Sequence, residues 1–226
     1  GAHIRKRTRL IKAVAFDVDG TLFSSENIIL DTYIDSIKKF INASGISIQI
    51  PTKEKIIEQV GLPVKQIFKN LLPFLTEDQR DSISDNVLIL LCEKIAAKKG
   101  TLYEGVEECI QYLSKRNYQL LIASNGRAAY INTILSTYGI DKFFGDLVVI
   151  NYTSIQTKGD ILKSYINKLG IASECILMVG DRKSDLDAAL DNNAPFAFCQ
   201  YGHADKDEIS IYDLLLETIT DLQKYL

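Results

Sequence analysis

Asp17 and Asp19 close the first apolar run of the chain and are two positions apart. In extended chain, such side chains point to the same side, so the two carboxylates can converge on one small volume. Two carboxylates at such a short distance raise each other's pKa unless a cation lies between them or one of them keeps a proton. Gly20 permits a sharp turn, and Thr21 offers a hydroxyl and an N–H group to an anion. The spacing suits acid–base chemistry, nucleophilic chemistry or cation binding, although a polar loop that ends a strand has the same composition.

A second pair of carboxylates follows the apolar run 176–179. Asp181 comes after the glycine that ends this run, and Asp185 lies four positions later, on the same side of a starting helix. Each could be an N-cap by itself. At the sheet edge that holds Asp17, however, three or four carboxylates would repel one another unless a hard cation joined them. An all-oxygen site that tolerates water suits Mg²⁺ best, so the pattern predicts a magnesium site.

Two further segments have the opposite electrical character. Ser124 and Asn125 follow the apolar run 119–123 and precede a predicted helix, whose first N–H groups can point at an anion. Lys158 stands at the start of the next predicted helix, where its charge would stabilise a phosphoryl group as negative charge redistributes. Taken alone, Lys158 could be a solvent-facing lysine and Ser124 an N-cap.

The elements that must position these residues alternate along the chain. Short apolar runs rich in β-branched residues are separated by segments of helical periodicity, which is typical of a parallel sheet covered by helices. Ligands of such doubly wound α/β folds bind beyond the carboxyl ends of the strands. The predicted strands are residues 11–16, 119–123, 147–150, 176–179 and 196–199, and the predicted helices are residues 106–116, 128–138, 160–169 and 184–192.

One stretch interrupts this alternation. Residues 23–99 contain no convincing strand, and their apolar residues recur at helical spacing. We expect them to form a helical cap domain of about four helices, inserted after the first strand. Residues 1–22 and 100–226 are then the Rossmann-like catalytic core. One or two helices are expected to close the chain after residue 207.

Composition excludes several classes of protein. The 226 residues are 46% hydrophobic and 24% charged, with a net charge of −3, so nothing attracts nucleic acid or an anionic membrane. No apolar run approaches the ~20 residues needed to cross a bilayer. The four cysteines lack Cys-x-x-Cys spacing and are expected to be buried thiols in a reducing cytoplasm. His3 and His203 are both expected at the surface, which argues against a Ser-His-Asp triad or a histidine-rich zinc site.

In their order, the polar segments resemble the four motifs of the haloacid dehalogenase superfamily of phosphatases. The predicted helical cap after the first motif is similar to that of the phosphoglycolate phosphatase and β-phosphoglucomutase subgroup, and residues 61–63 resemble a segment of that cap. Lys158 departs from many members, whose lysine has a proline beside it. The residues that resemble motifs one to four are, in turn, residues 17–21, Ser124 with Asn125, Lys158, and residues 180–185.

The resemblance implies a Mg²⁺-dependent phosphatase with a two-step mechanism. Asp17 would attack phosphorus and become an aspartyl-phosphate, while Asp19 would protonate the leaving group and then activate the hydrolytic water. The implied metal ligands are the Asp17 carboxylate, the Asp19 backbone carbonyl, Asp181, and Asp185 either directly or through water. The residues implied to bind the phosphoryl oxygens are Gly20, Thr21, Ser124, Asn125 and Lys158.

Two other functions stay open. A phosphomutase would pass the phosphoryl group to a sugar hydroxyl instead of water, and a catalytically idle relative would only bind a phosphorylated ligand. Dehalogenase and phosphonatase activities are not expected, because those members of the superfamily lack a carboxylate at the position of Asp19. The expected partner is a small-molecule phosphate ester, with no nucleic acid and no membrane, and the expected assembly is a monomer or weak dimer.

Overall fold

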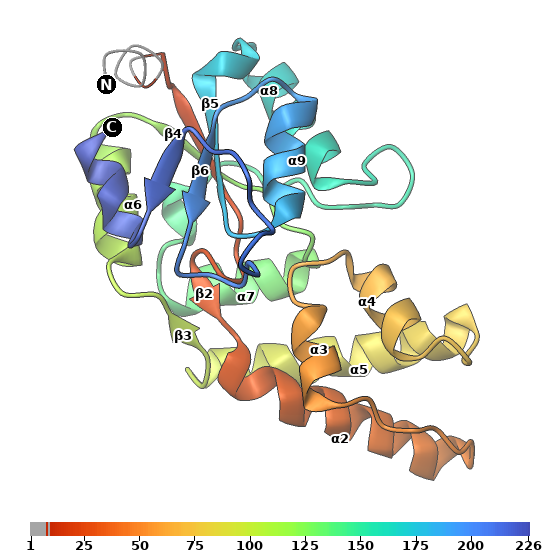
Figure 1. The fold of residues 1–226 in the computed structure, drawn as a ribbon. Coiled ribbons are helices and arrows are strands. Elements are labelled where there is room, and N and C mark those ends of the chain that lie inside the picture. Colours follow the sequence, from red (N-terminus) through yellow and green to blue (C-terminus); the bar gives the residue numbers. More distant parts are fainter. Residues whose placement is uncertain (1–7, 9) are drawn as a thin grey trace.

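A five-stranded parallel sheet lies at the centre of one part of the molecule (Figure 1). The computed structural model describes residue 8 and residues 10–226, so the expectation for His3 lies outside the described residues. The strand order is β4-β1-β5-β6-β7, which confirms the predicted α/β fold and places β1 inside the sheet. The strands are β1 (Ala13–Phe16), β4 (Gln119–Ile122), β5 (Ile176–Gly180), β6 (Phe196–Cys199) and β7 (Leu214–Leu216).

The carboxyl ends of β1, β4 and β5 are level with one another. Phe16 is in register with Ile122 of β4 and with Val179 of β5. The pairing continues past the strand ends, because the Asp17 N–H donates to the Val179 carbonyl at 2.9 Å and the Ala123 N–H donates to the Phe16 carbonyl at 2.8 Å. The polar segments that follow these three strands therefore leave the sheet at one edge, where ligands of α/β folds bind.

Helices cover both faces of the sheet. The alternation of side chains along β1 directs Val14 and Phe16 to the face that packs on α6 and α7, and Ala13 and Ala15 to the face that packs on α8 and α9. Burial on both faces explains why the strands read as continuous apolar runs. The helices of this part are α6 (Val106–Lys115), α7 (Ala128–Thr137), α8 (Lys158–Leu169) and α9 (Lys183–Asp191), with short 3₁₀ helices at Asp141–Phe143 and Ser173–Cys175.

Four helices form a second group beyond the sheet edge, at the lower right of Figure 1. Their interior contains the fully buried Ile37, Ile56 and Ile83. The rings of Tyr33 and Phe68 stack there with centroids 5.4 Å apart. Within the described part of the chain, none of the helices combines the length and apolarity that a bilayer crossing requires. The four helices are α2 (Glu26–Ser44), α3 (Lys53–Glu58), α4 (Val64–Leu71) and α5 (Glu77–Ala96).

A two-stranded antiparallel ribbon joins the helical group to the sheet. It consists of β2 (Phe23–Ser24), which follows β1, and β3 (Thr101–Leu102), which precedes α6. Phe23 pairs with Leu102, so the chain leaves the sheet and returns to it along adjacent paths. The Phe23 ring is fully buried against Gly100, where a Cβ would overlap it. The β2 strand also lies at the start of a stretch in which no strand was expected.

The strand predicted at residues 147–150 does not form. The Val148 N–H donates to the Tyr165 hydroxyl of α8 at 3.0 Å instead of to a neighbouring strand. At this edge of the sheet only an isolated bridge joins Leu120 and Phe144. The apolar side chains of the segment pack against the two hydrophobic clusters, so the run is apolar without being a strand.

The helices predicted after residue 207 are also wrong. This part of the chain contains β7 and a 3₁₀ helix (Ile219–Lys224). Leu214 pairs with Ala197 of β6, so a neighbouring strand satisfies the backbone hydrogen bonds of the leucine run. Ile219 and Leu222 are buried as expected, but in the 3₁₀ helix that packs on α6. The apolar spacing predicted burial correctly and the local conformation wrongly, because strand pairing is a long-range contact.

Candidate active site

Three buried carboxylates meet at the sheet edge. Asp17 follows β1, whereas Asp181 and Asp185 follow β5. Each offers one oxygen atom, and these three atoms lie within 4.8 Å of one another. The structure thus brings together carboxylates that are more than 160 positions apart in the sequence, as the strand-end pattern predicts.

Lys158, the first residue of α8, lies between two of these carboxylates. Its Nζ atom is 3.1 Å from Asp17 Oδ1 and 2.5 Å from Asp185 Oδ1. The lysine side chain is only 2% exposed, which excludes a solvent-facing lysine. Burial alone would lower the pKa of Lys158, but the two carboxylates outweigh burial and raise it. A buried positive charge is therefore fixed beside Asp17.

Asp185 holds the loop after β5 in place. Its Oδ2 accepts the backbone N–H groups of Asp181 and Arg182, both at 3.0 Å, while its Oδ1 accepts from Lys158. A Cβ at Gly180 would overlap the Asp185 carboxylate, so this close approach requires glycine. Both oxygens of Asp185 already have partners within the protein. This arrangement favours an indirect role of Asp185 at a metal over direct ligation.

Asp181 is held by His203. This histidine was expected at the surface, but the structure buries it. Asp181 Oδ2 accepts the backbone N–H of His203 at 2.8 Å and lies 3.2 Å from His203 Nδ1. The histidine side chain is 8% exposed, because the loop after β6 folds back over the neighbouring β5. Burial opposes the charged ring, but the hydrogen bond with Asp181 outweighs it and raises the pKa of His203. Burial likewise favours protonated Asp181, and the hydrogen bonds from His203 overcome this and lower the pKa of Asp181.

The turn after Asp19 packs directly on Asp181. Gly20 has a φ of +82°, and a Cβ there would overlap both the Asp181 carboxylate and the His203 ring. The buried Thr21 places its hydroxyl 3.5 Å from Asp181 Oδ1. Gly20 and Thr21 thus lie beside Asp181, but the N–H groups expected to meet an anion donate to the Phe23 and Val18 carbonyls, and the Thr21 hydroxyl is directed at a carboxylate.

The charges of this cluster are not balanced within the protein. Three carboxylates face one lysine, which leaves two negative charges uncompensated before His203 is counted. Burial, followed by the charge of Asp185, raises the pKa of Asp17 well above its usual range, and Lys158 opposes this only in part. Asp17 Oδ2 is buried and has no hydrogen-bond partner among the described residues. A divalent cation would offset the repulsion and bind this free oxygen, so the donor set fits Mg²⁺.

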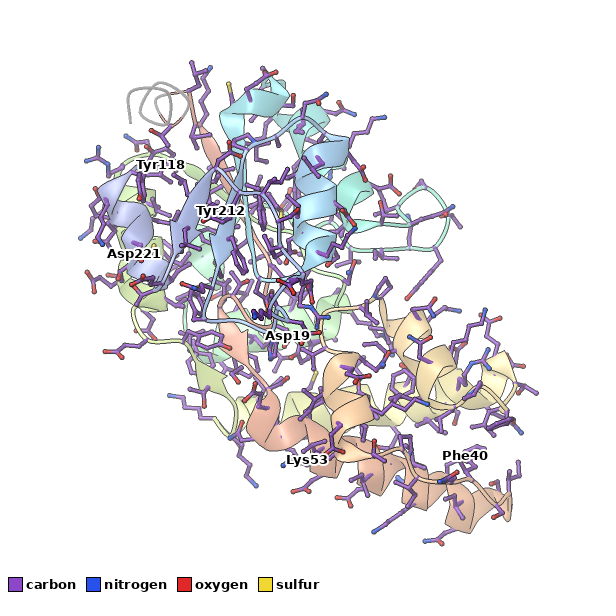
Figure 2. All side chains as sticks on the ribbon, in the orientation of Figure 1. Asp19, Phe40, Lys53, Tyr118, Tyr212 and Asp221 are labelled. Carbon is purple, nitrogen blue, oxygen red and sulfur yellow. The ribbon has the colours of Figure 1, made fainter. Side chains whose placement is uncertain are left out.

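Asp19 lies where the sheet edge meets the helical group (Figure 2). Its Oδ1 accepts a hydrogen bond of 2.6 Å from the Tyr130 hydroxyl of α7. Desolvation raises the pKa of Asp19 to about 6, although the hydrogen bond from Tyr130 opposes the rise. A carboxyl group with a pKa near neutrality can both give and take a proton in a catalytic cycle.

The loop after β4 supplies the predicted hydroxyl and amide. Ser124 Oγ accepts the Gly126 N–H at 3.0 Å, and Asn125 Nδ2 donates to the Gly61 carbonyl of the helical group at 2.9 Å. Arg127 occupies the N-cap position of α7, so Ser124 is not its N-cap. Asn125 Oδ1 is buried without a hydrogen-bond partner in the described part of the chain. Ser124 and Asn125 both line the same cavity as Asp17.

A cavity of about 70 Å³ reaches part of this cluster. Asp17, Asp19, Ser124 and Asn125 line its end at the sheet, and α2, α4 and α5 contribute most of the remaining wall. The carboxylates of Asp17 and Asp19 and the Ser124 loop thus face one common space.

Sequence reasoning missed three residues at this edge. His203 follows the predicted strand 196–199, so the strand-end pattern that found Asp17 could have found it. Tyr130 had no such signal, because helical periodicity assigns it only to a buried face. Arg182 joins the two parts of the molecule through its hydrogen bond of 3.0 Å to the Val60 carbonyl, and it also pairs with Glu208 at 2.9 Å.

The sequence of residues 11–192 matches the family of haloacid dehalogenase-like hydrolases. The chain belongs to this family. The resemblance carried by the four motifs is thereby confirmed, as are the enzyme class of hydrolase and the α/β fold. Curated relatives of this haloacid dehalogenase-like hydrolase are named as phosphatases, which supports the class of phosphoric monoester hydrolase.

Those relatives align over nearly their whole length. Pyrophosphatase PpaX of Listeria welshimeri is 24% identical over 95% of this chain and 96% of its own. Phosphoglycolate phosphatase of Escherichia coli K12 is 23% identical over 94% of this chain and 91% of its own. Among solved structures, a predicted phosphoglycolate phosphatase from Haemophilus somnus superimposes with a TM-score of 0.83 at 20% identity, over 95% of this chain and 97% of that one. A predicted phosphatase from Clostridium acetobutylicum gives 0.79 at 24% identity, with the same coverage. At these identities the structures establish the fold.

Proposed function

We propose that this hydrolase is a Mg²⁺-dependent phosphatase that hydrolyses a small phosphorylated metabolite through an aspartyl-phosphate. The observation that carries the proposal is the cluster of Asp17, Asp181, Asp185 and Lys158, in which a carboxylate oxygen of Asp17 stays buried without a partner among the described residues. The names of the relatives, a pyrophosphatase and a phosphoglycolate phosphatase, support phosphorus as the centre that reacts.

Asp17 is the proposed nucleophile. Lys158 holds one of its oxygens at 3.1 Å and so fixes the direction in which the carboxylate faces the cavity. A carboxylate oxygen of Asp17 attacks phosphorus, and the bond from phosphorus to the alkoxide oxygen breaks. Water then attacks the same phosphorus atom, the bond to Asp17 breaks, and phosphate leaves with the carboxylate restored.

Asp19 is the proposed acid and base of these two steps. It gives its proton to the departing alkoxide and takes one back from the attacking water. The Tyr130 hydroxyl holds the Asp19 carboxyl at 2.6 Å, and the pKa of about 6 lets the group exist in both states near neutral pH. Because Asp19 and Asp17 both line the cavity, one bound ester can reach both.

Mg²⁺ would be held by the carboxylates of Asp17 and Asp181 and the backbone carbonyl of Asp19, with Asp185 acting through water or through Lys158. When bound, the ion supplies positive charge that neutralises the phosphoryl oxygens. Lys158, Ser124 and Asn125 are the proposed partners of those oxygens.

Residues 23–99 are proposed as the cap domain that closes over the ester, and residues 1–22 and 100–226 as the catalytic core. Excluding water from the cavity would protect the reaction and strengthen its electrostatic interactions. A cytoplasmic location is a further proposal, supported by the four cysteines, which are all free thiols.

Hydrolysis of p-nitrophenyl phosphate tests the proposal. We expect activity with Mg²⁺, its loss on addition of EDTA, and a fall in kcat on the order of 10⁴ in Asp17→Asn. Asp187→Asn, at a half-exposed site one turn along α9, is the matched control and should keep wild-type activity. Robust turnover by Asp17→Asn with an intact fold would refute the nucleophile. Incubation with a hexose phosphate and its bisphosphate separates a phosphatase, which releases free phosphate, from a phosphomutase, which isomerises the sugar without releasing phosphate.

A further inference from the structure

The wall of the cavity opposite the carboxylates is almost entirely apolar. It is built by side chains from α2, α4 and α5 and from the segment before α4, and the stacked rings of Tyr33 and Phe68 belong to it. Among the side chains of these elements that line the cavity, the polar groups are the neutral hydroxyls of Tyr33, Ser25 and Ser84. Representative wall residues are Ile29, Leu62, Ile67, Phe68, Val87 and Leu88.

Positive charge is nearly absent from this wall. Of the described residues that line the cavity, Arg127 alone is cationic, and its Nη1 pairs with Asp85 Oδ1 at 2.6 Å. Lys65 follows the wall residue Val64, yet its Nζ pairs with Glu77 at 2.7 Å and Asp81 at 3.6 Å, in an adjoining hollow that shares Phe68 and Ser84 with the cavity. Lys65 thus already has two carboxylate partners outside the cavity.

From this wall we infer the chemical class of the substrate, an inference that rests on the proposed phosphatase function. We propose that the alcohol released from phosphorus is uncharged and largely apolar, and that esters with a second anionic group are poor substrates. An apolar alcohol gains free energy by leaving water for this wall. A second phosphate or a carboxylate would lose its hydration and find no free cation there to replace it. In this respect the chain should differ from the relatives named for pyrophosphate and phosphoglycolate.

A comparison of two primary alkyl esters tests the inference in the wild-type enzyme. Benzyl phosphate and 2-phosphoglycolate both release a CH₂–O⁻ group, so they differ mainly in the ring or carboxylate that must occupy the cavity. We expect kcat/KM for benzyl phosphate to exceed that for 2-phosphoglycolate by at least about tenfold with Mg²⁺ present. Inorganic pyrophosphate, assayed in parallel, should also be at least about tenfold poorer than benzyl phosphate.

A charge placed in the wall should change this preference. Leu88 of α5 is partly exposed and lines the cavity, so Leu88→Arg introduces a cation that could meet a second anion. We expect this variant to reduce the ratio of the two kcat/KM values by about tenfold or more. The control is Ile89→Arg at the next position, which is 57% exposed and outside the cavity, and which should keep the wild-type ratio. The wild-type ratio decides the inference even if Leu88→Arg fails to fold.

The outcomes separate the two proposals. Faster hydrolysis of 2-phosphoglycolate or pyrophosphate than of benzyl phosphate overturns the apolar substrate class and leaves the phosphatase function standing. Hydrolysis of none of the three overturns the inference alone if p-nitrophenyl phosphate is still hydrolysed, and overturns the proposed function with it if p-nitrophenyl phosphate is not hydrolysed either. A tenfold preference for benzyl phosphate that Leu88→Arg reduces and Ile89→Arg keeps supports the inference.

Discussion

The two ends of the cavity are built on opposite principles. At the sheet edge, buried charges dominate, and the backbone N–H groups of Asp181, Arg182 and His203 fix the carboxylates of Asp185 and Asp181. At the helical end, the wall consists mainly of apolar side chains that pack against one another. Apolar packing tolerates exchange of residues of similar volume, whereas a buried charge network does not. The reacting end is therefore rigidly specified, and the end that meets the rest of the substrate can vary.

Lys158→Met affects the charged end alone. Without its ammonium group, Asp17 and Asp185 face each other with no positive charge between them. We expect the free energy of unfolding without metal, measured by urea denaturation, to fall by about 3–5 kcal/mol, as when one partner of a buried ion pair is removed. We expect kcat/KM to fall by about 10²- to 10³-fold, as when one group that stabilises the transition state is removed. Lys183→Met is the control, because the Lys183–Asp187 pair is exposed and contributes less than about 0.5 kcal/mol. Equal losses in both variants would remove the contrast between the ends.

Metal binding should stabilise the protein through the same charged end. At about 100 times its dissociation constant, Mg²⁺ should add about 2.7 kcal/mol, a rise in Tm of about 5–10 °C in differential scanning calorimetry. Asp181→Asn should lose most of this rise, and its metal-free Tm should also fall, because the hydrogen bonds from His203 that lower the pKa of Asp181 stabilise the ionised carboxylate. A full Mg²⁺ shift in Asp181→Asn would contradict the assignment of this ligand.

Tyr130→Phe tests whether Tyr130, which lies between the two ends of the cavity, positions Asp19. The variant loses the hydrogen bond that holds Asp19, so kcat should fall about tenfold, with about 1 kcal/mol less stability. Tyr112→Phe loses hydrogen bonds to the carbonyls of Gln223 and Leu226, away from the cavity, and should lose similar stability at unchanged kcat. Equal kcat values for both variants would mean that Tyr130 does not position Asp19.

Arg127→Gln should have the smallest effect. The Arg127–Asp85 pair joins α7 to α5 at the cavity mouth, but both side chains are exposed, so stability should change by no more than about 1 kcal/mol. Because the apolar wall is expected to hold the alcohol, KM for benzyl phosphate should stay within about threefold of wild type. A large rise in KM would show that this cation contributes to binding after all.

Much of the fold and most of the site follow from local patterns. Apolar runs flanked by helical periodicity placed β1, β4, β5 and β6 and the four helices of the sheet part to within a few residues. The carboxylates were found because Asp17 and Asp181 directly follow such runs, and parallel strands end at a common edge. Lys158 could be placed near them only through the order of the motifs, since one lysine at a helix start has no specific pattern.

The parts of the fold and of the site that the sequence did not predict depend on contacts between distant segments. Residues 147–150 and 214–216 are both apolar and short, yet only the latter meet a free strand edge, which β6 provides. The burial of His203 likewise depends on the pairing of β6 with β5. The Tyr130–Asp19 hydrogen bond joins residues that are 111 positions apart, and no local spacing encodes it.

The β2–β3 ribbon makes the helical insertion a cassette. Because Phe23 and Leu102 are paired, the segment between them starts and ends at neighbouring positions. Removal of this segment would leave the two chain ends already adjacent. Recombination at the β2–β3 ribbon could replace the whole helical segment while the carboxyl ends of the sheet strands stay in place. A lineage could then acquire new substrates without rebuilding its catalytic machinery.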